Sequence, residues 1–328
     1  MQDGKPAGCI SPGDNATSWF SRYSLYLLLA VMFWGLSFIA IKYALRELDP
    51  VPMIAARFLL AGPVLYLIIR AKGLRIRTVE KRGKLVLASL VVFFHFWIMA
   101  TGLKEVSASH TAWILSTAPV FITLLAWLWL KERFASVKWL GVALAIAGVV
   151  VMTANGTLEN LGWINSRGDL IVLSSCVTWA VHTVITRDLT TRIDPLVATF
   201  WMTGIAGLIF VPLTLVTDGP SIWTDLDLWT WLSLIFLGVF CLAIAFWLWA
   251  EGLAKQTAAR VGVYLYIEPL FAMFFAWLLL GEAITLWLIL GAGMITAGVY
   301  VTERFGRERR QITSQPPSLS AETAGNIP

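Results

Sequence analysis

Charged residues are scarce in this sequence. Asp, Glu, Lys and Arg make up only 14% of its 328 residues, whereas hydrophobic residues make up 58%. The mean hydropathy is +0.75. A chain with so little polar side-chain content would be insoluble as a globule surrounded by water. The composition therefore predicts an integral membrane protein.

Cysteine is also rare, and the common catalytic motifs are missing. Cys9, Cys176 and Cys241 show no paired spacing, which argues against a disulfide framework or a zinc site. The sequence has no Walker loop, no His-Glu-x-x-His, no Gly-x-Ser-x-Gly and no paired aspartates within a helix. These absences exclude an ATP-driven pump in a single chain. We expect no enzyme, no metal and no cofactor.

Long apolar runs dominate what is present. Most have the roughly 20 residues that a bilayer-spanning helix needs, and the loops between them are short. The first run is too long for a cleavable signal, so we expect it to stay in the mature protein. We predict ten helices, at about 24–46, 50–70, 84–103, 108–130, 136–153, 168–188, 195–217, 228–251, 258–280 and 284–303.

The second half of the chain repeats the first. Residues 102–151 match residues 252–301 at a fixed offset of 150, with 17 identical positions and no gap. An earlier stretch matches at an offset of 145, where Trp34 aligns with Trp179. Each copy holds five apolar runs, so the second copy must enter the membrane from the opposite face. The sequence predicts an all-α integral membrane protein of ten transmembrane helices, arranged as two inverted five-helix repeats. Many secondary transporters are built in this way, which points to alternating access.

The domain organisation follows from the repeat. We expect an N-terminal cytoplasmic tail at 1–23, a first five-helix repeat at 24–153, a second at 168–303, and a C-terminal cytoplasmic tail at 304–328. The last segment is rich in Ser, Pro and Thr and is expected to be disordered.

Lys and Arg are distributed very unevenly between the two sides. With the N-terminus inside, 20 of the 25 Lys and Arg residues fall on inner segments, four fall on outer segments, and Arg57 lies within a helix. The positive-inside rule then places both termini in the cytoplasm. The formal net charge of +5 is mainly a topology signal, and we expect no nucleic-acid partner.

Several short motifs occur in a characteristic order. They are Trp34-Gly35-Leu36-Ser37-Phe38, Ala56-Arg57-Phe58, Pro119, Lys131-Glu132-Arg133, Glu268-Pro269 and Gly281-Glu282. Their order, spacing and duplication over about residues 24–303 resemble the EamA-type transporters of the drug/metabolite transporter superfamily. The resemblance implies a central cavity that opens alternately to each side. It also implies efflux or uptake of small metabolites, in bacteria usually across the cytoplasmic membrane.

The two repeats differ at two charged positions. Met202 stands where the second repeat would echo Arg57, and Ala118 stands opposite Glu268. The halves are therefore not chemically equivalent.

Glu268 is the strongest candidate for a functional residue. By helical rise it lies about 15 Å from the cytoplasmic face, where an ionised carboxylate costs at least a few kcal/mol unless it is paired or hydrated. It should be protonated, ion-paired or exposed to a water-filled cavity, and any of these states could change during transport, which makes Glu268 a candidate for substrate binding or proton coupling. A structural carboxylate bonded to neighbouring helix ends is the alternative. Arg57 is a candidate partner for Glu268, or a structural anchor.

Histidines and aromatic residues complete the predicted cavity. His182 shares a helix face with Thr178, Trp179 and Thr186, which together form a polar and aromatic stripe. His95 lies near the middle of its helix, and histidine titrates near neutral pH. A hydrogen-bonded packing role is the alternative for each histidine. The further predicted lining residues are Trp34, Ser37, Trp113, Ser116, Tyr264 and Tyr266.

Two prolines lie about eleven residues into their helices. Pro119 and Pro269 each delete one helical hydrogen bond, which is expected to leave the carbonyls of Leu115 and Leu265 free. Such a break can act as a hinge or bind substrate. A packed kink without a ligand is the alternative.

Other conspicuous residues are interpreted as structural. Glu132 and Glu282 lie at helix ends, where we expect them to orient loops. The small-residue pairs Gly141/Ala145 and Gly293/Ala297 predict tight helix packing.

We therefore expect a secondary active transporter, an exporter of small metabolites such as amino acids or their derivatives, with proton coupling as an option. Two alternatives stay open. The first is efflux of lipophilic cations or drugs, with Glu268 as the counter-charge. The second is a membrane enzyme or sensor that kept the fold without transporting. The expected partners are a small-molecule substrate and the lipid bilayer, with a homodimer left open. The expected location is the bacterial cytoplasmic (inner) membrane.

Overall fold

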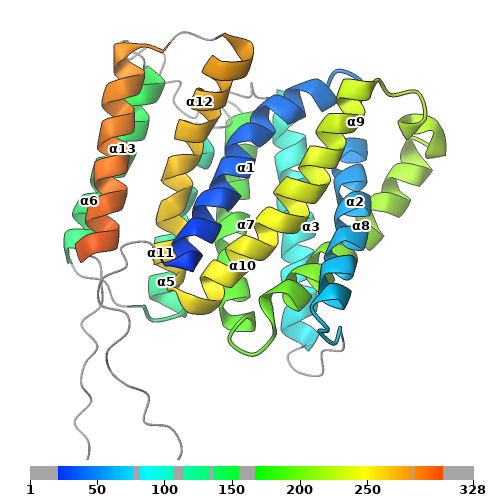
Figure 1. Ribbon diagram of the computed structural model, residues 1–328, viewed down its shortest axis with the longest axis horizontal. Coiled ribbons are helices and arrows are strands. Elements are labelled where there is room, and N and C mark those ends of the chain that lie inside the picture. Colours follow the sequence, from blue (N-terminus) through cyan, green and yellow to red (C-terminus); the bar gives the residue numbers. More distant parts are fainter. Residues whose placement is uncertain are drawn as a thin grey trace, which may run out of the picture.

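The computed structural model describes residues 21–76, 82–105, 114–132, 136–154, 167–281 and 284–305. These residues form helices joined by short turns, without strands in the described ranges (Figure 1). Seven helical segments are long and apolar enough to cross a membrane, and three shorter apolar helices accompany them. The predicted all-α fold of ten membrane-crossing segments is confirmed.

The first half contributes five helical segments. They are α1 (Arg22–Ala44), α2 (Pro50–Ala71), α3 (Arg82–Glu105), α5 (Ala118–Trp129) and α6 (Ser136–Ala154). The part of the predicted fourth helix at 108–113 lies outside the described residues, as do most of the two predicted tails.

The second half contains the counterparts. Its simple helices are α7 (Arg167–Leu189), α8 (Pro195–Thr217) and α13 (Leu286–Phe305). One composite span runs from α9 (Leu228–Ile235) through the π-helical segment η3 (Phe236–Ile244) to α10 (Ala245–Lys255). The other runs from α11 (Ala258–Val263) through the 3₁₀ turn η4 (Tyr264–Ile267) to α12 (Glu268–Leu280). A short 3₁₀ helix, η2 (Pro220–Trp223), precedes α9.

Local chemistry explains where helices begin. Asp194 accepts hydrogen bonds from the backbone N–H groups of Leu196 (2.9 Å) and Val197 (3.4 Å), and Pro195 occupies the first helical position of α8. A carboxylate cap followed by proline is a favourable helix start because proline has no N–H to leave unpaired. Asp49-Pro50 stands at the equivalent start of α2.

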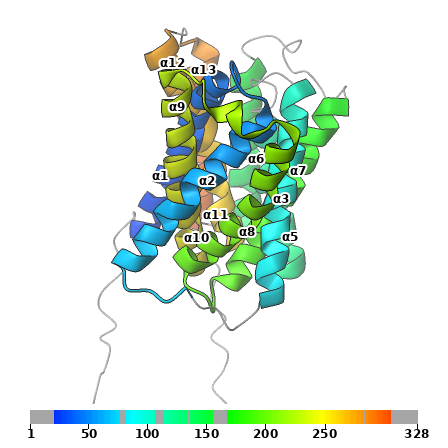
Figure 2. The ribbon, with the colours of Figure 1, turned by 90° about the vertical axis from the view of Figure 1, so that its right-hand side faces the viewer.

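The helices pack with an internal two-fold symmetry. Helix α1 packs against the α9–α10 span and α12, while its counterpart α7 packs against α3 and α5. The pairs α2/α8 and α6/α13 join counterparts directly, and α5 packs against α11, which belongs to the span that corresponds to its own. Figure 1 shows α6 and α13 together at one edge of the molecule, and Figure 2 gives the view from the side. Each of these contacts of α1 therefore has an equivalent at α7, in which the two halves swap roles, as two inverted repeats require.

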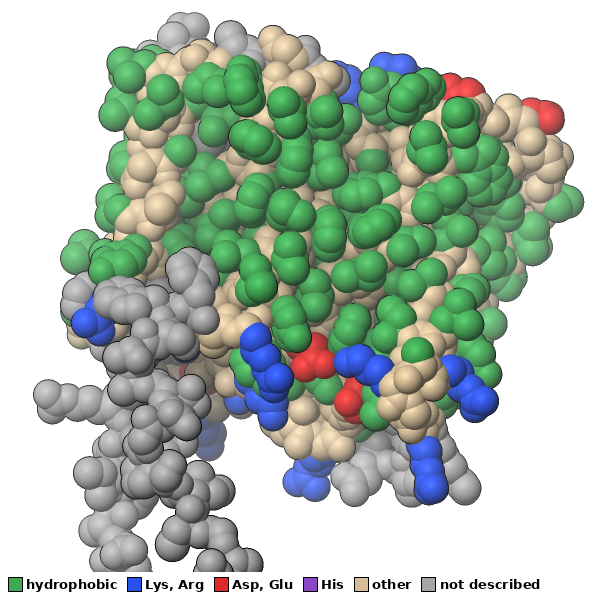
Figure 3. Space-filling model, viewed as in Figure 1, with side chains coloured by type: hydrophobic (Ala, Val, Ile, Leu, Met, Phe, Trp, Pro, Cys, Tyr) green, Lys and Arg blue, Asp and Glu red, His purple; other side chains and the backbone are tan. Residues whose placement is uncertain are grey.

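The ends of the helices meet at two opposite faces. On one face Lys84 Nζ lies 2.8 Å from Asp188 Oδ2, and Arg187 Nη1 donates to the carbonyl of Ala254 (3.3 Å). We call this end, which carries Lys72, Lys84 and Arg187, the basic face. Figure 3 shows Lys and Arg side chains gathered mainly at the lower end of the molecule, below a broad hydrophobic belt. On the opposite face, Trp223 Nε1 donates to the carbonyl of Pro52 (3.2 Å).

Glycine allows α6 and α13 to approach closely. A Cβ atom at Gly148 would lie 2.7 Å from the carbonyl oxygen of Gly291, and one at Gly298 would lie 2.5 Å from that of Gly141. These two contacts are symmetry equivalents, because each partner is shifted by 150 residues. The prediction for Gly293/Ala297 is wrong: a Cβ at Gly293 would meet no atom within 4 Å, and Ala297 is exposed. The closely packed glycines of α13 lie on another side of the helix.

Candidate functional site

A pocket lies between the two halves at the middle of the helix bundle. It has a volume of about 100 Å³. In the same measure one water needs about 10–15 Å³, so the pocket has room for several waters or one small solute. Its lining comprises Trp34, Ser37, Phe38, Ile41, Arg57, His95, Phe96, Met99, Leu115, Ala118, Trp179, Phe246, Leu265 and Glu268. Of the predicted site residues, Glu268, Arg57, His95, Trp179, Trp34 and Ser37 are brought together here.

Both predicted proline breaks lie beside this pocket. In the second half, η4 interrupts the span, and α12 restarts at Glu268-Pro269. In the first half, Thr117 precedes α5, which restarts at Ala118-Pro119. Ala118 and Glu268, which align in the repeat, are thus the first residues of two new helices and both line the pocket. Negative charge is favoured at such helix starts because unpaired N–H groups point toward it.

The 3₁₀ turn changes one expectation. The backbone N–H of Glu268 donates to the carbonyl of Leu265, so the prediction that Pro269 leaves this carbonyl free is wrong. A tighter turn bonds residues three apart instead of four, which recovers the acceptor that proline would otherwise leave unused.

Glu268 and Arg57 face the same pocket without pairing. They form no ion pair within 4.0 Å, and the carboxylate of Glu268 has no hydrogen-bond partner among the described residues. Arg57 is buried, its Nε has no partner in the described part of the chain, and its Cζ lies 5.2 Å from the centroid of the Phe96 ring. Glu268 remains partly accessible through the pocket. A buried charge without a partner is costly, so these groups are available to a ligand.

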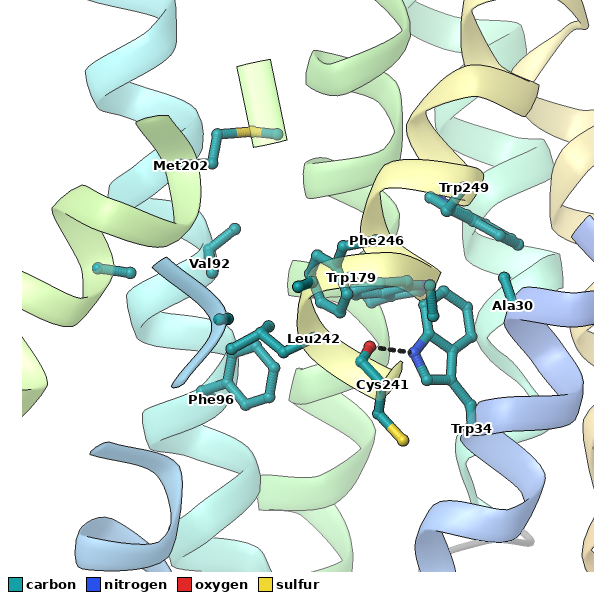
Figure 4. Close-up of a cluster of buried hydrophobic side chains, with 14 of the residues drawn as sticks. Ala30, Trp34, Val92, Phe96, Trp179, Met202, Cys241, Leu242, Phe246 and Trp249 are labelled. Carbon is teal, nitrogen blue, oxygen red and sulfur yellow. Dashed lines mark hydrogen bonds between the residues drawn. The ribbon is translucent and has the colours of Figure 1, made fainter. Parts of the chain in front are cut away.

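Aromatic rings form the walls. Trp34 meets its repeat equivalent Trp179 edge to face at 5.3 Å, and Phe96 stacks on Phe246 at 6.0 Å. Trp34 is held in place because its Nε1–H donates to the carbonyl of Cys241 (2.9 Å), as the dashed line in Figure 4 marks. Most buried ring surface here is apolar, so it suits the apolar part of an amphipathic ligand.

His95 is fixed by the neighbouring helix. Its Nδ1 lies 3.1 Å from the carbonyl oxygen of Ser175 and 3.2 Å from Thr178 Oγ1. A carbonyl only accepts hydrogen bonds, so Nδ1 carries the proton in the bond to Ser175, and Nε2 is the acceptor of the neutral ring. His95 can thus accept a hydrogen bond from a ligand.

Other predicted residues lie away from the lining. His182 is buried behind Trp179, with ring centroids 5.1 Å apart, and its Nδ1 lies 3.4 Å from Thr186 Oγ1. Tyr264 is buried beside the lining, and Tyr266 packs in an apolar cluster with α6 and α13. Ser116 is in the turn before α5, outside the lining, and Trp113 lies outside the described residues.

Several residues of the pocket lining were not predicted from the sequence, above all Phe96 and Phe246. A signal was present: extending the offset of 150 by six residues before Gly102/Gly252 aligns Phe96-Trp97 with Phe246-Trp247. Residues that repeat and lie near the symmetry axis meet each other, as these two rings do.

The EamA-like transporter family matches residues 21–154 and 166–304. Two uncharacterised transporters of Archaeoglobus fulgidus are similar over nearly their whole length. One is 30% identical, covering 86% of this chain and 97% of the relative; the other is 29% identical, covering 85% and 98%. A protein of Salmonella typhimurium named "Probable amino-acid metabolite efflux pump" is 27% identical, covering 86% and 95%. A solved crystal structure shares the fold, with a TM-score of 0.74, 20% identity, and coverage of 86% of this chain and 96% of that one.

Proposed function

The chain belongs to the EamA-like transporter family, and from this premise we propose that it is a secondary active transporter that exports small amphipathic metabolites by alternating access. Amino acids and their derivatives are the proposed substrates. The name of the Salmonella typhimurium relative supports this choice.

The observation that carries the proposal is the unpaired Arg57 and Glu268 in one pocket. A zwitterion would satisfy both, because its carboxylate can accept from the guanidinium while its ammonium donates to the carboxylate. His95 offers a further acceptor, and the aromatic walls suit an apolar side chain. A ligand of this kind supplies the partners that the protein itself does not.

Glu268 is also the proposed proton carrier. A carboxylate in the middle of a membrane must be neutralised or hydrated, and either a proton or a substrate ammonium can neutralise it. If the two compete, export of substrate is coupled to entry of a proton. The coupling arises because each ligand favours a different charge state of the same residue.

The symmetric packing supports alternating access. Both halves supply pocket walls, and both supply a helix that restarts at a proline. Exchanging the conformations of two near-equivalent halves opens the pocket to the other side. The distribution of Lys and Arg supports both termini in the cytoplasm of a bacterial cell, with the protein in the cytoplasmic membrane.

The test is uptake into proteoliposomes of labelled amino acids, with substitution of each charge. We expect Arg57→Gln to raise the half-saturating concentration by about tenfold or more, since a hydrogen bond to a charged group contributes roughly 1.5–3 kcal/mol. Arg46→Gln is the matched control, because Arg46 is exposed and its Cζ lies 4.3 Å from the ring centroid of Tyr43, away from the pocket. Equal uptake by the Arg57 variant and wild type would contradict the zwitterion proposal.

Efflux of lipophilic cations is the second candidate. Aromatic walls around a single carboxylate favour cations, whose positive charge is attracted to ring faces. Such a substrate needs Glu268 but gains nothing from Arg57. Arg57→Gln would then leave cation transport intact or improve it, whereas Glu268→Gln would abolish it.

A further inference from the structure

A carboxylate joins the two halves at the basic face. Glu132, two residues beyond Leu130, the C-cap of α5, accepts hydrogen bonds from the backbone N–H groups of Ala258 (2.8 Å) and Ala259 (3.2 Å). These are the first two residues of α11. The bond therefore crosses from the first repeat to the second.

The turn that places Glu132 is a feature of the repeat. Lys131 has a φ of 53°, in the left-handed region that is unfavourable for residues other than glycine. Its equivalent at an offset of 150 is Gly281, with a φ of 69°, which ends α12. The second half uses glycine for this turn, whereas the first half makes the same turn with lysine. The backbone N–H of Glu132 then bonds back to the carbonyl of Ala126 (3.2 Å).

Glu132 caps α11 in place of the residue that would normally do so. Thr257 is the N-cap residue, and threonine side chains commonly accept from the first free N–H groups of a helix. Here the Thr257 side chain makes no capping hydrogen bond, because both oxygens of Glu132 take that role from another segment. A carboxylate is favoured at this position by the partial positive charge of the helix start.

This contact lies between the pocket and the basic face. Along α5 the pocket residue Ala118 comes first, then Ile122, and Glu132 follows three residues after the helix ends at Trp129. Along the second-half span, Ala258 comes first, then Gly262, then the pocket residue Leu265. A Cβ at Gly262 would lie 3.0 Å from Ile122 Cγ2, so α5 and α11 are in close contact below the pocket. The end of the bundle at which Glu132 lies is the basic face, because Arg187 of that face bonds to the carbonyl of Ala254, four residues before the start of α11.

We propose that Glu132 is a clasp that holds the pocket closed toward the basic face and that is released when the pocket opens there. The proposal rests on alternating access as proposed above. Opening on this side requires the ends of α5 and α11 to separate, which breaks both bonds of Glu132. The Thr257 hydroxyl is in position to cap α11 afterwards, so the helix start keeps a partner in the open state.

The experiment measures from which side the pocket is accessible. Ser37→Cys places a thiol in the pocket lining, in a background where Cys9, Cys176 and Cys241 are replaced by alanine. A membrane-impermeant maleimide is applied to either side of sealed vesicles without substrate. Labelling of Lys84→Cys, whose side chain is exposed, identifies the side occupied by the basic face. The ratio of Ser37→Cys labelling from the basic face to labelling from the other face is the readout.

Removing the clasp is expected to raise that ratio. In Glu132→Ala the increase should be about tenfold or less, the range for loss of a helix cap. An unchanged ratio would overturn the proposal. If Glu132→Ala does not insert, Glu132→Gln keeps one acceptor oxygen and should give a smaller increase, and no increase would again overturn it.

A second substitution separates a clasp from an ordinary helix cap. Adding Thr257→Asp to Glu132→Ala supplies a carboxylate cap within the second half without joining the halves. We expect the thermal stability of the purified protein to recover while the ratio stays raised. A return of the ratio to the wild-type value would show that Glu132 only caps a helix.

Glu251→Gln is the matched control. Glu251 is also a partly buried glutamate near the basic face, but it accepts from Trp247 Nε1 (3.0 Å) within its own helix. We expect its ratio to match the wild type, and a shift as large as that of Glu132→Ala would overturn the clasp. The readout needs no substrate, so a failure to transport amino acids would leave it unaffected.

Discussion

At the scale of single residues, one charge from each half faces the pocket. Arg57 comes from α2 and Glu268 from α12, and their repeat equivalents are the uncharged Met202 and Ala118. The helices are arranged symmetrically, but the charged side chains in the pocket between them are not. A zwitterionic substrate, bound as proposed above, would therefore be held in one orientation relative to the two halves.

The first prediction concerns proton coupling. Glu268→Gln keeps the shape of the side chain but cannot take up or release a proton. An imposed pH gradient should no longer stimulate flux, so the ratio of flux with and without the gradient falls to about one. Substrate counterflow, which needs no net proton movement, should survive. Flux into proteoliposomes measures both.

Glu251→Gln serves as the control for this prediction, since Glu251 lies outside the pocket lining. If wild-type transport is driven by protons and the Glu268 variant responds to the gradient as the wild type does, Glu268 is not the carrier. His95 would then be the next residue to test.

Charged and polar residues of the pocket could be predicted from the sequence because a membrane segment tolerates them only for a reason. Glu268, Arg57, His95 and Ser37 stood out in this way and do line the pocket. Tyr264 could not be placed correctly. In an α-helix it shares a face with Glu268, four residues on, but in a 3₁₀ turn the residues three apart are aligned, so Leu265 lines the pocket with Glu268 instead.

At the scale of helices, the breaks at Pro119 and Pro269 are the features most relevant to motion. Each proline directly follows a residue of the pocket lining, Ala118 or Glu268, and lets the two parts of its span lie at different angles. The two broken spans contact each other, because α5 packs against α11 and η4. Bending at these points would move both pocket walls.

The second prediction follows from these breaks. Pro119→Ala and Pro269→Ala restore a backbone donor and remove the constraint on the chain, so each should reduce flux while membrane insertion stays near normal. Insertion is measured by the amount of protein in the membrane fraction, and flux in proteoliposomes. Wild-type flux in both variants would show that the prolines are packed kinks.

The third prediction compares two glycines of the α6/α13 pair. Gly148→Ala adds a methyl group 2.7 Å from the Gly291 carbonyl oxygen and should destabilise the protein by about 1–3 kcal/mol. Gly293→Ala enters open space, so it should stabilise the helix by up to about 1 kcal/mol. The midpoints of thermal unfolding in one detergent report the difference. Equal midpoints would mean that close packing of this pair contributes little.

Most helix positions could be predicted because long apolar runs and Asp-Pro starts mark them directly. The internal form of the composite spans could not. The π-helical η3 and the 3₁₀ turn η4 differ from an α-helix in the spacing of their backbone hydrogen bonds. That spacing depends on packing against residues distant in sequence. The face of α13 that packs against α6 could not be predicted either. Several glycines and alanines occur along that helix, and only the packed structure shows which of them contact α6.

At the scale of the whole molecule, the helix ends sort into two faces. Contacts at the basic face join segments that the sequence predicts on the inner side, such as Arg187 with Ala254. Contacts at the opposite face join predicted outer segments, such as Trp223 with Pro52. The alternation of the helices is thus fixed by packing, and the charge asymmetry between the faces gives its expected direction in the cell.

The fourth prediction tests that direction. Reporter fusions at Arg77 and after Arg310 should be cytoplasmic, and a fusion in the loop from Asp218 to Asp225 should be external, because basic segments are retained inside. Paired reporters that are active on opposite sides of the membrane give the measurement. A cytoplasmic signal from the last loop would overturn the proposed orientation.

Trp34 and Trp179 meet at the symmetry axis, each facing the residue that corresponds to itself. Such a contact is what two separate, identical subunits would form when inserted in opposite directions. In a pair of identical subunits every side chain would appear twice, so a pocket between them could hold two arginines or two glutamates but never one of each alone. One chain that contains both halves is free of this restriction. The single Arg57 and the single Glu268, whose repeat equivalents are Met202 and Ala118, are an arrangement that no identical pair could have, although the tryptophan contact is one that such a pair could make.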